Sequence, residues 1–154
     1  MTAPARSNAL ALLTRARDRL CALPLEHLVE TMRPLPVTPL PGAPSFVRGL
    51  SLIRGAPVPV VDLGALLGAR EPSESTRFVT VRVGGRRVAL AVERVVGIQR
   101  LPAVLTALPP LLAEAAAESV SAIGAADGEL LLLLQALRLV PDSVWRQGEA
   151  RSAG

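Results

Sequence analysis

The sequence predicts an all-β fold with short helices, organised as two copies of one small β unit. Three observations predict this class. Short runs rich in Val, Leu and Ile are separated by turns containing Gly or Pro, a weak internal repeat spans most of the chain, and no apolar run reaches the roughly 18 residues of a bilayer-spanning helix. The chain has 154 residues, 50% of them hydrophobic, so we expect one domain with a sizeable core.

The first unit begins with a predicted pair of strands. Two apolar segments between residues 9 and 25 flank a charged turn at 15–19, which is typical of strand, turn, strand. Residues 24–32 predict a short helical turn or an irregular strand. The connector from Pro34 to Pro44 contains five prolines, and because proline cannot occupy a helix interior, we expect a surface link there.

A hairpin is predicted between residues 46 and 62, with its turn at Arg54-Gly55-Ala56-Pro57. Gly tolerates positive φ and Pro cannot continue a helix, so the two apolar runs meet in a tight turn. Pro57 and Pro59 lack a backbone donor, which favours an edge or bulged strand. The carboxylate of Asp62 is expected to accept amide hydrogens that open a short helical turn.

The second unit begins after a polar loop. Residues 69–76 have the composition of a subdomain boundary. Strands are predicted at 77–83 and 87–92, joined by a tight turn at Gly84-Gly85. This is the second hairpin.

The remaining segments complete the second unit. The Ala-rich segment 110–119 is expected to be helical, and the five leucines at 130–134 suit a strand buried on both faces. Residues 136–146 carry apolar side chains at near-helical spacing and are expected to pack back as a C-terminal helix. Residues 1–8 and 147–154 are expected to be flexible.

The internal repeat appears when the chain is compared with itself. An offset of 67 residues aligns 11–33 with 78–100, and an offset of 73 places 55–62 on 128–135. We therefore expect two subdomains, 9–68 and 77–135, each a small closed barrel, since closure removes exposed sheet edges. The identical pairs under the first offset are Arg15/Arg82, Arg19/Arg86, Ala22/Ala89, Leu23/Leu90, Glu26/Glu93, Val29/Val96 and Arg33/Arg100.

Composition limits the function classes. The net charge of +4 is spread along the chain, which predicts a solvated surface; the alternative is a weak basic patch for an acidic partner, and Arg86-Arg87 is the sharpest local cluster. The chain has two Phe, one Trp and no Tyr, which argues against a base-stacking nucleic-acid surface.

Reactive groups are sparse. Cys21 lies in an apolar run and is expected to be buried filler, and His27 aligns with Arg94 in the repeat, which indicates an exposed position. One Cys and one His cannot complete a zinc site, and no phosphate-binding Gly loop is present. Glu26 and Glu30 are expected to form a solvated face. The sequence therefore predicts no enzyme activity, no cofactor and no metal, and a function that resides in surfaces.

The predicted hairpin at residues 46–62 contains a sequence motif that resembles that of a known family. The run Arg54-Gly-x-Pro-Val-Pro-Val-Val-Asp-Leu63, preceded by Val47-Arg-Gly-Leu50, resembles the signature of CheW-like domains, the adaptor modules of bacterial chemotaxis. The resemblance implies one CheW-like domain over 9–146, made of two SH3-like five-stranded barrels that share a core. It further implies two partners, the signalling tips of chemoreceptors and the regulatory domain of the CheA histidine kinase.

The resemblance also implies a set of contact residues. Arg54 and Glu30 correspond to charged residues on the functional surface of the family. Gly49, Gly55, Pro57 and Asp62 are interpreted as structural. The apolar positions that would line a receptor-binding groove between the subdomains are Leu28, Phe78, Val95 and Ile98.

The chain departs from the family at several positions. Glu93 replaces a common Asp, and Leu20-Cys21 replaces an aromatic residue and a glycine, which bears on kinase contacts more than on the groove. The start of the chain lacks the apolar region of a signal peptide, so a cytoplasmic location at membrane-associated receptor arrays is expected, with no membrane insertion. Two alternatives stay open: a CheW-like adaptor in a non-flagellar chemosensory pathway, and a basic small-barrel nucleic-acid-binding module.

Overall fold

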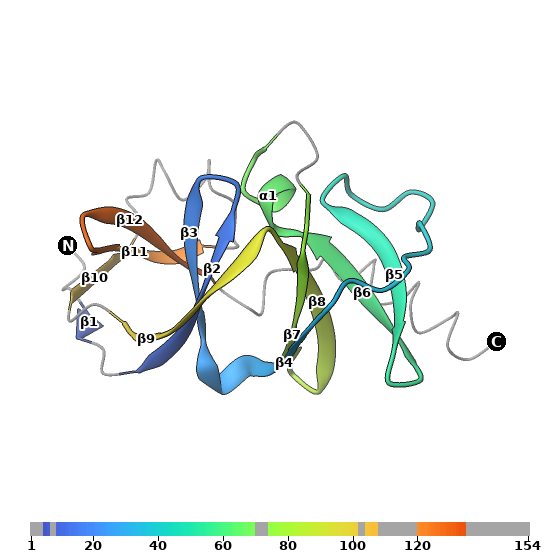
Figure 1. Cartoon of the computed structure of the whole chain (residues 1–154), viewed down its shortest axis with the longest axis horizontal. Coiled ribbons are helices and arrows are strands. Elements are labelled where there is room, and N and C mark those ends of the chain that lie inside the picture. Colours follow the sequence, from blue (N-terminus) through green and yellow to red (C-terminus); the bar gives the residue numbers. More distant parts are fainter. Residues whose placement is uncertain (1–4, 7–8, 70–73, 102–103, 108–119, 135–154) are drawn as a thin grey trace.

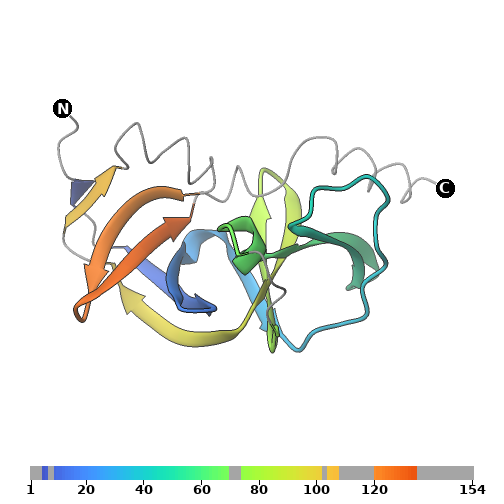
Figure 2. The same cartoon turned by 90° about the horizontal axis from the view of Figure 1, so that it is seen from above.

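The structure is a computed structural model that describes residues 5–6, 9–69, 74–101, 104–107 and 120–134. These residues form two β-sheets with very little helix, and the sheets lie side by side along the long axis of the molecule (Figures 1 and 2). The predicted fold class, all-β with short helices, is confirmed. No helix in this described part of the chain is long and apolar enough to cross a membrane.

The first sheet contains β1 (Ala5–Arg6), β2 (Leu10–Ala16), β3 (Arg19–Pro24), β9 (Arg94–Arg100), β10 (Val104–Ala107), β11 (Val120–Ala126) and β12 (Glu129–Leu134). The second contains β4 (Leu28–Met32), β5 (Val47–Ile53), β6 (Ala56–Asp62), β7 (Arg77–Val83) and β8 (Arg86–Val92). Their hydrogen-bonded orders are β1-β10-β11-β12-β3-β2-β9 and β4-β7-β8-β6-β5. A 3-10 turn, η1 (Leu25–His27), leads into β4, and a short helix, α1 (Leu63–Leu66), follows β6.

Two details of the barrel prediction need correction. The first sheet has seven strands instead of five, because β10 pairs with β11 and β1 pairs with β10. Within the part of the chain that the structure describes, both hydrogen-bonded orders are linear, so neither sheet closes through a strand pair between its two end strands. Each is a curled sheet, and the two pack against each other.

The two repeat units are present, but they exchange their first hairpins. The hairpin β2–β3 belongs to the first unit, yet it pairs with β9 and β12 of the second; the hairpin β7–β8 belongs to the second unit, yet it pairs with β4 and β6 of the first. The two sheets therefore do not coincide with the expected subdomains at 9–68 and 77–135. One sheet uses 28–92, and the other uses residues on both sides of that range.

The registers show that the exchange is symmetrical. In the second sheet Val60 of β6 pairs in parallel with Ala89 of β8, and in the first sheet Leu133 of β12 pairs in parallel with Ala22 of β3. These are the same positions under the two sequence offsets. The β-bulges also match, because the shift at Val47/Gly49 recurs at Val120/Ala122. The repeat inferred from sequence is thus a repeat of backbone pairing.

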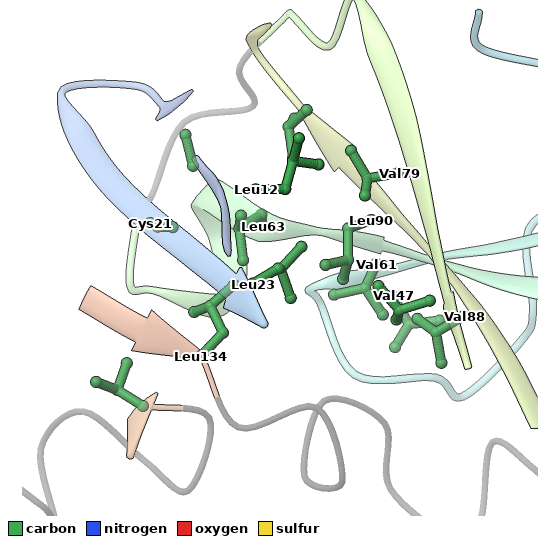
Figure 3. Close-up of a cluster of buried hydrophobic side chains, with 14 of the residues drawn as sticks. Leu12, Cys21, Leu23, Val47, Val61, Leu63, Val79, Val88, Leu90 and Leu134 are labelled. Atoms are coloured by element: carbon green, nitrogen blue, oxygen red, sulfur yellow. The ribbon is translucent and has the colours of Figure 1, made fainter. Parts of the chain in front are cut away.

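One hydrophobic cluster joins the sheets. It contains buried side chains of the first sheet, such as Leu12 and Leu23, and of the second, such as Val61 and Leu90 (Figure 3). Two further clusters are each confined mainly to one sheet, around Leu131 in the first and around Phe78 in the second. Each sheet therefore has its own interior in addition to the core that the sheets share.

The predicted hairpin at residues 46–62 is confirmed as β5 and β6, but its proline strand is not an edge. β6 lies between β5 and β8 in the sheet. The parallel ladder with β8 begins only at Val60, after Pro57 and Pro59, so their missing N–H groups remove no bond from that ladder. The edge strand is β5. The expected helices at 110–119 and 136–146 lie outside the described residues.

Gly49 is fixed by a close backbone approach. Its φ is +143°, and a Cβ atom at this position would lie 2.0 Å from the carbonyl oxygen of Thr38. Thr38 exchanges two backbone hydrogen bonds of 2.8 Å with Leu50, so the connector cannot move away without breaking them. This contact explains why glycine is required in the Val47-Arg-Gly motif.

We expect Gly49→Ala to lower the free energy of unfolding by about 2 kcal/mol or more, from backbone strain and lost hydrogen bonds. The matched control is Gly42→Ala, at φ +78° with nothing within 4 Å, where only the positive-φ cost of about 1 kcal/mol applies. Denaturant unfolding of both variants checks this. Equal losses would show that the approach to Thr38 is unimportant.

Candidate functional site

The two charged residues expected on the functional surface contact each other. Arg54 begins the β5–β6 turn with φ of 54°, and its side chain is 69% exposed. Its Nη2 donates to Oε2 of Glu30 at 2.9 Å, and its Nε donates to Oε1 at 3.3 Å. This bidentate hydrogen bond, together with the negative charge of Glu30, raises the pKa of the Arg54 guanidinium.

This ion pair connects distant parts of the second sheet. Glu30 lies on β4, one end strand, whereas Arg54 lies on the turn that leaves β5, the other end strand. The pair can form only because the sheet curls until its ends approach. On β4, Glu30 is held by Thr80 of β7, whose Oγ1 accepts from the Glu30 amide and donates to its carbonyl, both at 3.2 Å. The Arg54–Glu30 ion pair, which we call the seam, therefore links the two ends of the curled sheet.

Phe78 lies in the interior of this curled sheet and does not line an accessible groove. Its exposed fraction is 1%, and it packs with Ile53, Val58 and Val60. The expectation that Phe78 lines a groove does not fit its position, because β7 is buried on both faces from Phe78 to Val81 and Phe78 belongs to the interior cluster of the second sheet. Phe78 is a core residue.

The other three apolar positions separate into two environments. Leu28 of β4 and Val95 of β9 are half-buried and pack against the same shared core cluster. Ile98, further along β9, is 56% exposed, and its neighbour Val96 is 43% exposed. β4 and β9 are end strands of their respective sheets. The apolar surface on these two end strands is therefore partly accessible.

A second ion pair joins two residues of the sequence motif, Arg48 and Asp62. Asp62 is only 5% exposed, and its Oδ1 accepts from the Ala65 amide at 3.1 Å, which confirms its predicted role at the start of α1. Its Oδ2 accepts from Nη2 of Arg48 at 2.8 Å, and Arg48 also donates to Ser75 at 2.8 Å. Arg48 belongs to the sequence motif, but no role was predicted for it. Its position fourteen residues before a capping Asp gave no sign of the contact.

The first sheet carries its own bidentate ion pair. Nη1 and Nη2 of Arg15, on β2, donate to the two carboxylate oxygens of Glu129, on β12, at 2.6 and 2.7 Å. This contact lowers the pKa of Glu129 and raises that of Arg15. The two strands are separated by β3, so the side chains bridge across it.

The described residues contain little reactive chemistry. They hold no group of three or more His, Cys, Asp or Glu side chains that could bind a metal ion. Cys21 is fully buried, and this burial raises the pKa of its thiol to about 12, so the reactive thiolate is suppressed. The only hydrogen-bonding or charged partner shown for His27 is the neighbouring Glu26, 3.6 Å away.

The two sheets around a shared core define the fold class of this chain as a two-sheet β domain. The comparisons with known proteins identify its family. Residues 10–144 match the CheW-like domain, and the chain belongs to this family. The predicted resemblance is confirmed.

Relatives and a solved structure agree with this assignment. The chain is 32% identical over 130 residues to Protein FrzA of Myxococcus xanthus, covering 83% of this chain and 81% of that protein. It is 42% identical over 62 residues to the Chemotaxis protein CheW of Rhizobium meliloti (strain 1021), covering 39% and 40% respectively. The crystal structure of the scaffolding protein TtCheW from Thermoanaerobacter tengcongensis has the same fold, with a TM-score of 0.71 at 21% identity over 83% of this chain and 89% of that one.

The Arg15–Glu129 pair gives a prediction for pH dependence. Because the pKa of Glu129 is lower in the folded protein than in the unfolded chain, its stabilising effect is present above the unfolded carboxyl pKa of about 4.3. The effect is lost as pH falls through the lower, folded pKa. We therefore expect Glu129→Gln to be less stable than the natural chain at neutral pH, with the difference vanishing in acid.

Thermal unfolding midpoints of both proteins, recorded across the acidic range, test this prediction. Glu26→Gln is the control, because Glu26 is well exposed and its contact with His27 is long, at 3.6 Å. A difference between Glu129→Gln and the natural chain that stays constant with pH would contradict the assignment.

Proposed function

We propose that this chain is a chemotaxis adaptor that couples the cytoplasmic tips of chemoreceptors to a CheA-class histidine kinase through protein–protein contacts. The observation that carries the proposal is the Arg54–Glu30 seam on an exposed turn of a CheW-like domain. The names of two similar proteins support it, because one is called a chemotaxis protein and the other a scaffolding protein. The domain is proposed to span 9–146 and to be neither an enzyme nor a nucleic-acid binder.

The two partners are assigned to different surfaces. The partly accessible apolar residues Leu28, Val95 and Ile98 suit the apolar stripe of an amphipathic receptor hairpin, and charges at the rim would set its register. Arg54, with Glu30 holding it in place, is assigned to the kinase. In the cell, the adaptor would be cytoplasmic and recruited to membrane-associated receptor arrays by these contacts.

A second candidate keeps the adaptor role but changes the pathway to non-flagellar chemosensory signalling, such as surface motility. Protein FrzA matches 83% of this chain, whereas the relative named as a chemotaxis protein matches 39%. Deleting the gene and scoring swimming and surface movement separately distinguishes the two. Loss of swimming chemotaxis alone supports the first candidate, and loss of surface movement alone supports the second.

We expect Arg54→Ala to reduce assembly of the receptor–kinase complex about tenfold while leaving the fold intact. A surface ion pair contributes about 0–1 kcal/mol to stability, whereas a charged group buried at an interface can contribute much more to binding. Co-sedimentation of kinase with receptor-containing membranes measures assembly. Arg19→Ala, at the exposed start of β3 in the other sheet, is the control.

A charge exchange separates the contact role of Arg54 from its role in the seam. The double variant Arg54→Glu with Glu30→Arg can re-form an ion pair between the same two positions with the charges reversed. We expect this variant to be as stable as the natural chain and still deficient in assembly. Full recovery of assembly would show that the seam alone matters and that Arg54 does not contact the kinase.

A further inference from the structure

The tip of the β7–β8 hairpin holds two arginines directly opposite each other. Arg82 of β7 is the cross-strand partner of Arg87 of β8, so both side chains emerge from the same face of the sheet. Arg82 is exposed and Arg87 is half-buried. Neither forms an ion pair with any carboxylate of the described residues. Like charges in opposed positions destabilise a sheet, so the repulsion between these two guanidinium groups lowers the stability of the hairpin.

Comparison of the two sheets shows that, among the described residues, Arg82 lacks the carboxylate partner that its counterpart in the first sheet has. Under the two offsets, Arg82 corresponds to Arg15 in the first sheet, and the carboxylate partner of Arg15, Glu129, corresponds to Ala56. The registers within the hairpins are the same around these positions in both sheets, but the parallel ladder between the hairpins begins two residues further along in the second sheet, at Val60 and Ala89. In the first sheet, the guanidinium therefore binds a carboxylate on the neighbouring hairpin. In the second sheet, the corresponding residue is a small, exposed alanine and a second arginine has been added.

We propose that Arg82 and Arg87, together with the open surface over Ala56, form a site that receives a carboxylate side chain from a protein partner. The incoming Asp or Glu takes the place that Glu129 occupies beside Arg15. Two guanidinium groups on one face can bind one carboxylate with charge-assisted hydrogen bonds, which also removes their mutual repulsion. The partner is therefore a protein segment with an acidic residue at the contact.

The location of this site connects it with the proposed function. Ala56 follows Arg54 and Gly55 directly at the start of β6, so the carboxylate site adjoins the Arg54 turn. The inference rests on the proposed function in one respect: it assigns the acidic segment to the kinase that Arg54 is proposed to contact. It goes further by naming the chemistry of the partner surface and the residues that read it.

The test measures binding of the full chain to a purified CheA-class histidine kinase from the same organism. Arg87→Glu removes one of the two charges and repels the carboxylate, so we expect about tenfold weaker binding. Ala56→Glu supplies a carboxylate from within the chain, as Glu129 does for Arg15, and should compete with the partner. We expect Ala56→Glu to weaken binding by a similar factor and to raise the thermal midpoint relative to Ala56→Gln.

Matched controls isolate the charge and the location. Ala56→Gln has nearly the size of the glutamate variant without its charge, and Arg77→Glu makes the same charge change as Arg87→Glu at the far end of the same hairpin. Both controls should bind within twofold of the natural chain. The inference is overturned if Arg87→Glu and Arg77→Glu have equal effects, or if Ala56→Glu binds as well as Ala56→Gln.

The result also distinguishes the inference from the proposal on which it rests. If the natural chain binds the kinase and the Arg87 and Ala56 variants bind equally well, the carboxylate site is wrong and the adaptor role stands. If the natural chain does not bind the kinase at all, the proposed function fails, and the assignment of this site fails with it.

Discussion

The exchange of hairpins between the two repeat units is the constraint on which the rest of the fold depends. Each sheet contains one antiparallel hairpin from one unit, and the strands on both sides of that hairpin come from the other unit. The parallel ladders β6–β8 and β12–β3 are the joints of this exchange, and the buried leucines Leu90 and Leu23 lie on strands of those ladders. Since parallel pairing requires long connections, neither sheet can be completed by one half of the chain alone.

Because the backbone is repeated so closely, the places where the side chains differ carry the specific information. The interior of the second sheet is filled by Phe78, whose counterpart in the first sheet is Ala11. The seam residues Glu30 and Arg54 have Gly97 and Asp127 as counterparts, so the first sheet lacks the corresponding ion pair. There, a hollow opens instead; its lining includes Leu13, Leu101, Ala126, Asp127 and Leu131. The two sheets therefore share a backbone arrangement, but the second is bridged by the Glu30–Arg54 ion pair and the first has a hollow at the corresponding place.

Sequence patterns predicted the elements well and their partners poorly. The hairpin around Arg54 and the cap at Asp62 followed from local rules, since turn and cap chemistry depends on residues close in sequence. The repeat was detectable from matched residues, but identity between two copies cannot show which copy pairs with which, and the exchange was missed. Phe78 was misassigned because an apolar strand residue has the same pattern on a covered face as on an open one. Arg48 was missed because its contacts depend on the folded hairpin.

The conformation of Arg54 indicates that stability alone does not explain this residue. A non-glycine residue in the left-handed region costs about 1–2 kcal/mol, and the corresponding turn position in the first sheet is Asp127, a residue type that tolerates this conformation more readily. The ion pair with Glu30 offsets little of this cost, because the Arg54 side chain is largely exposed to solvent. The balance is close to zero or unfavourable. Stability therefore does not account for an arginine in that turn, whereas the proposed contact of its exposed guanidinium with a partner would.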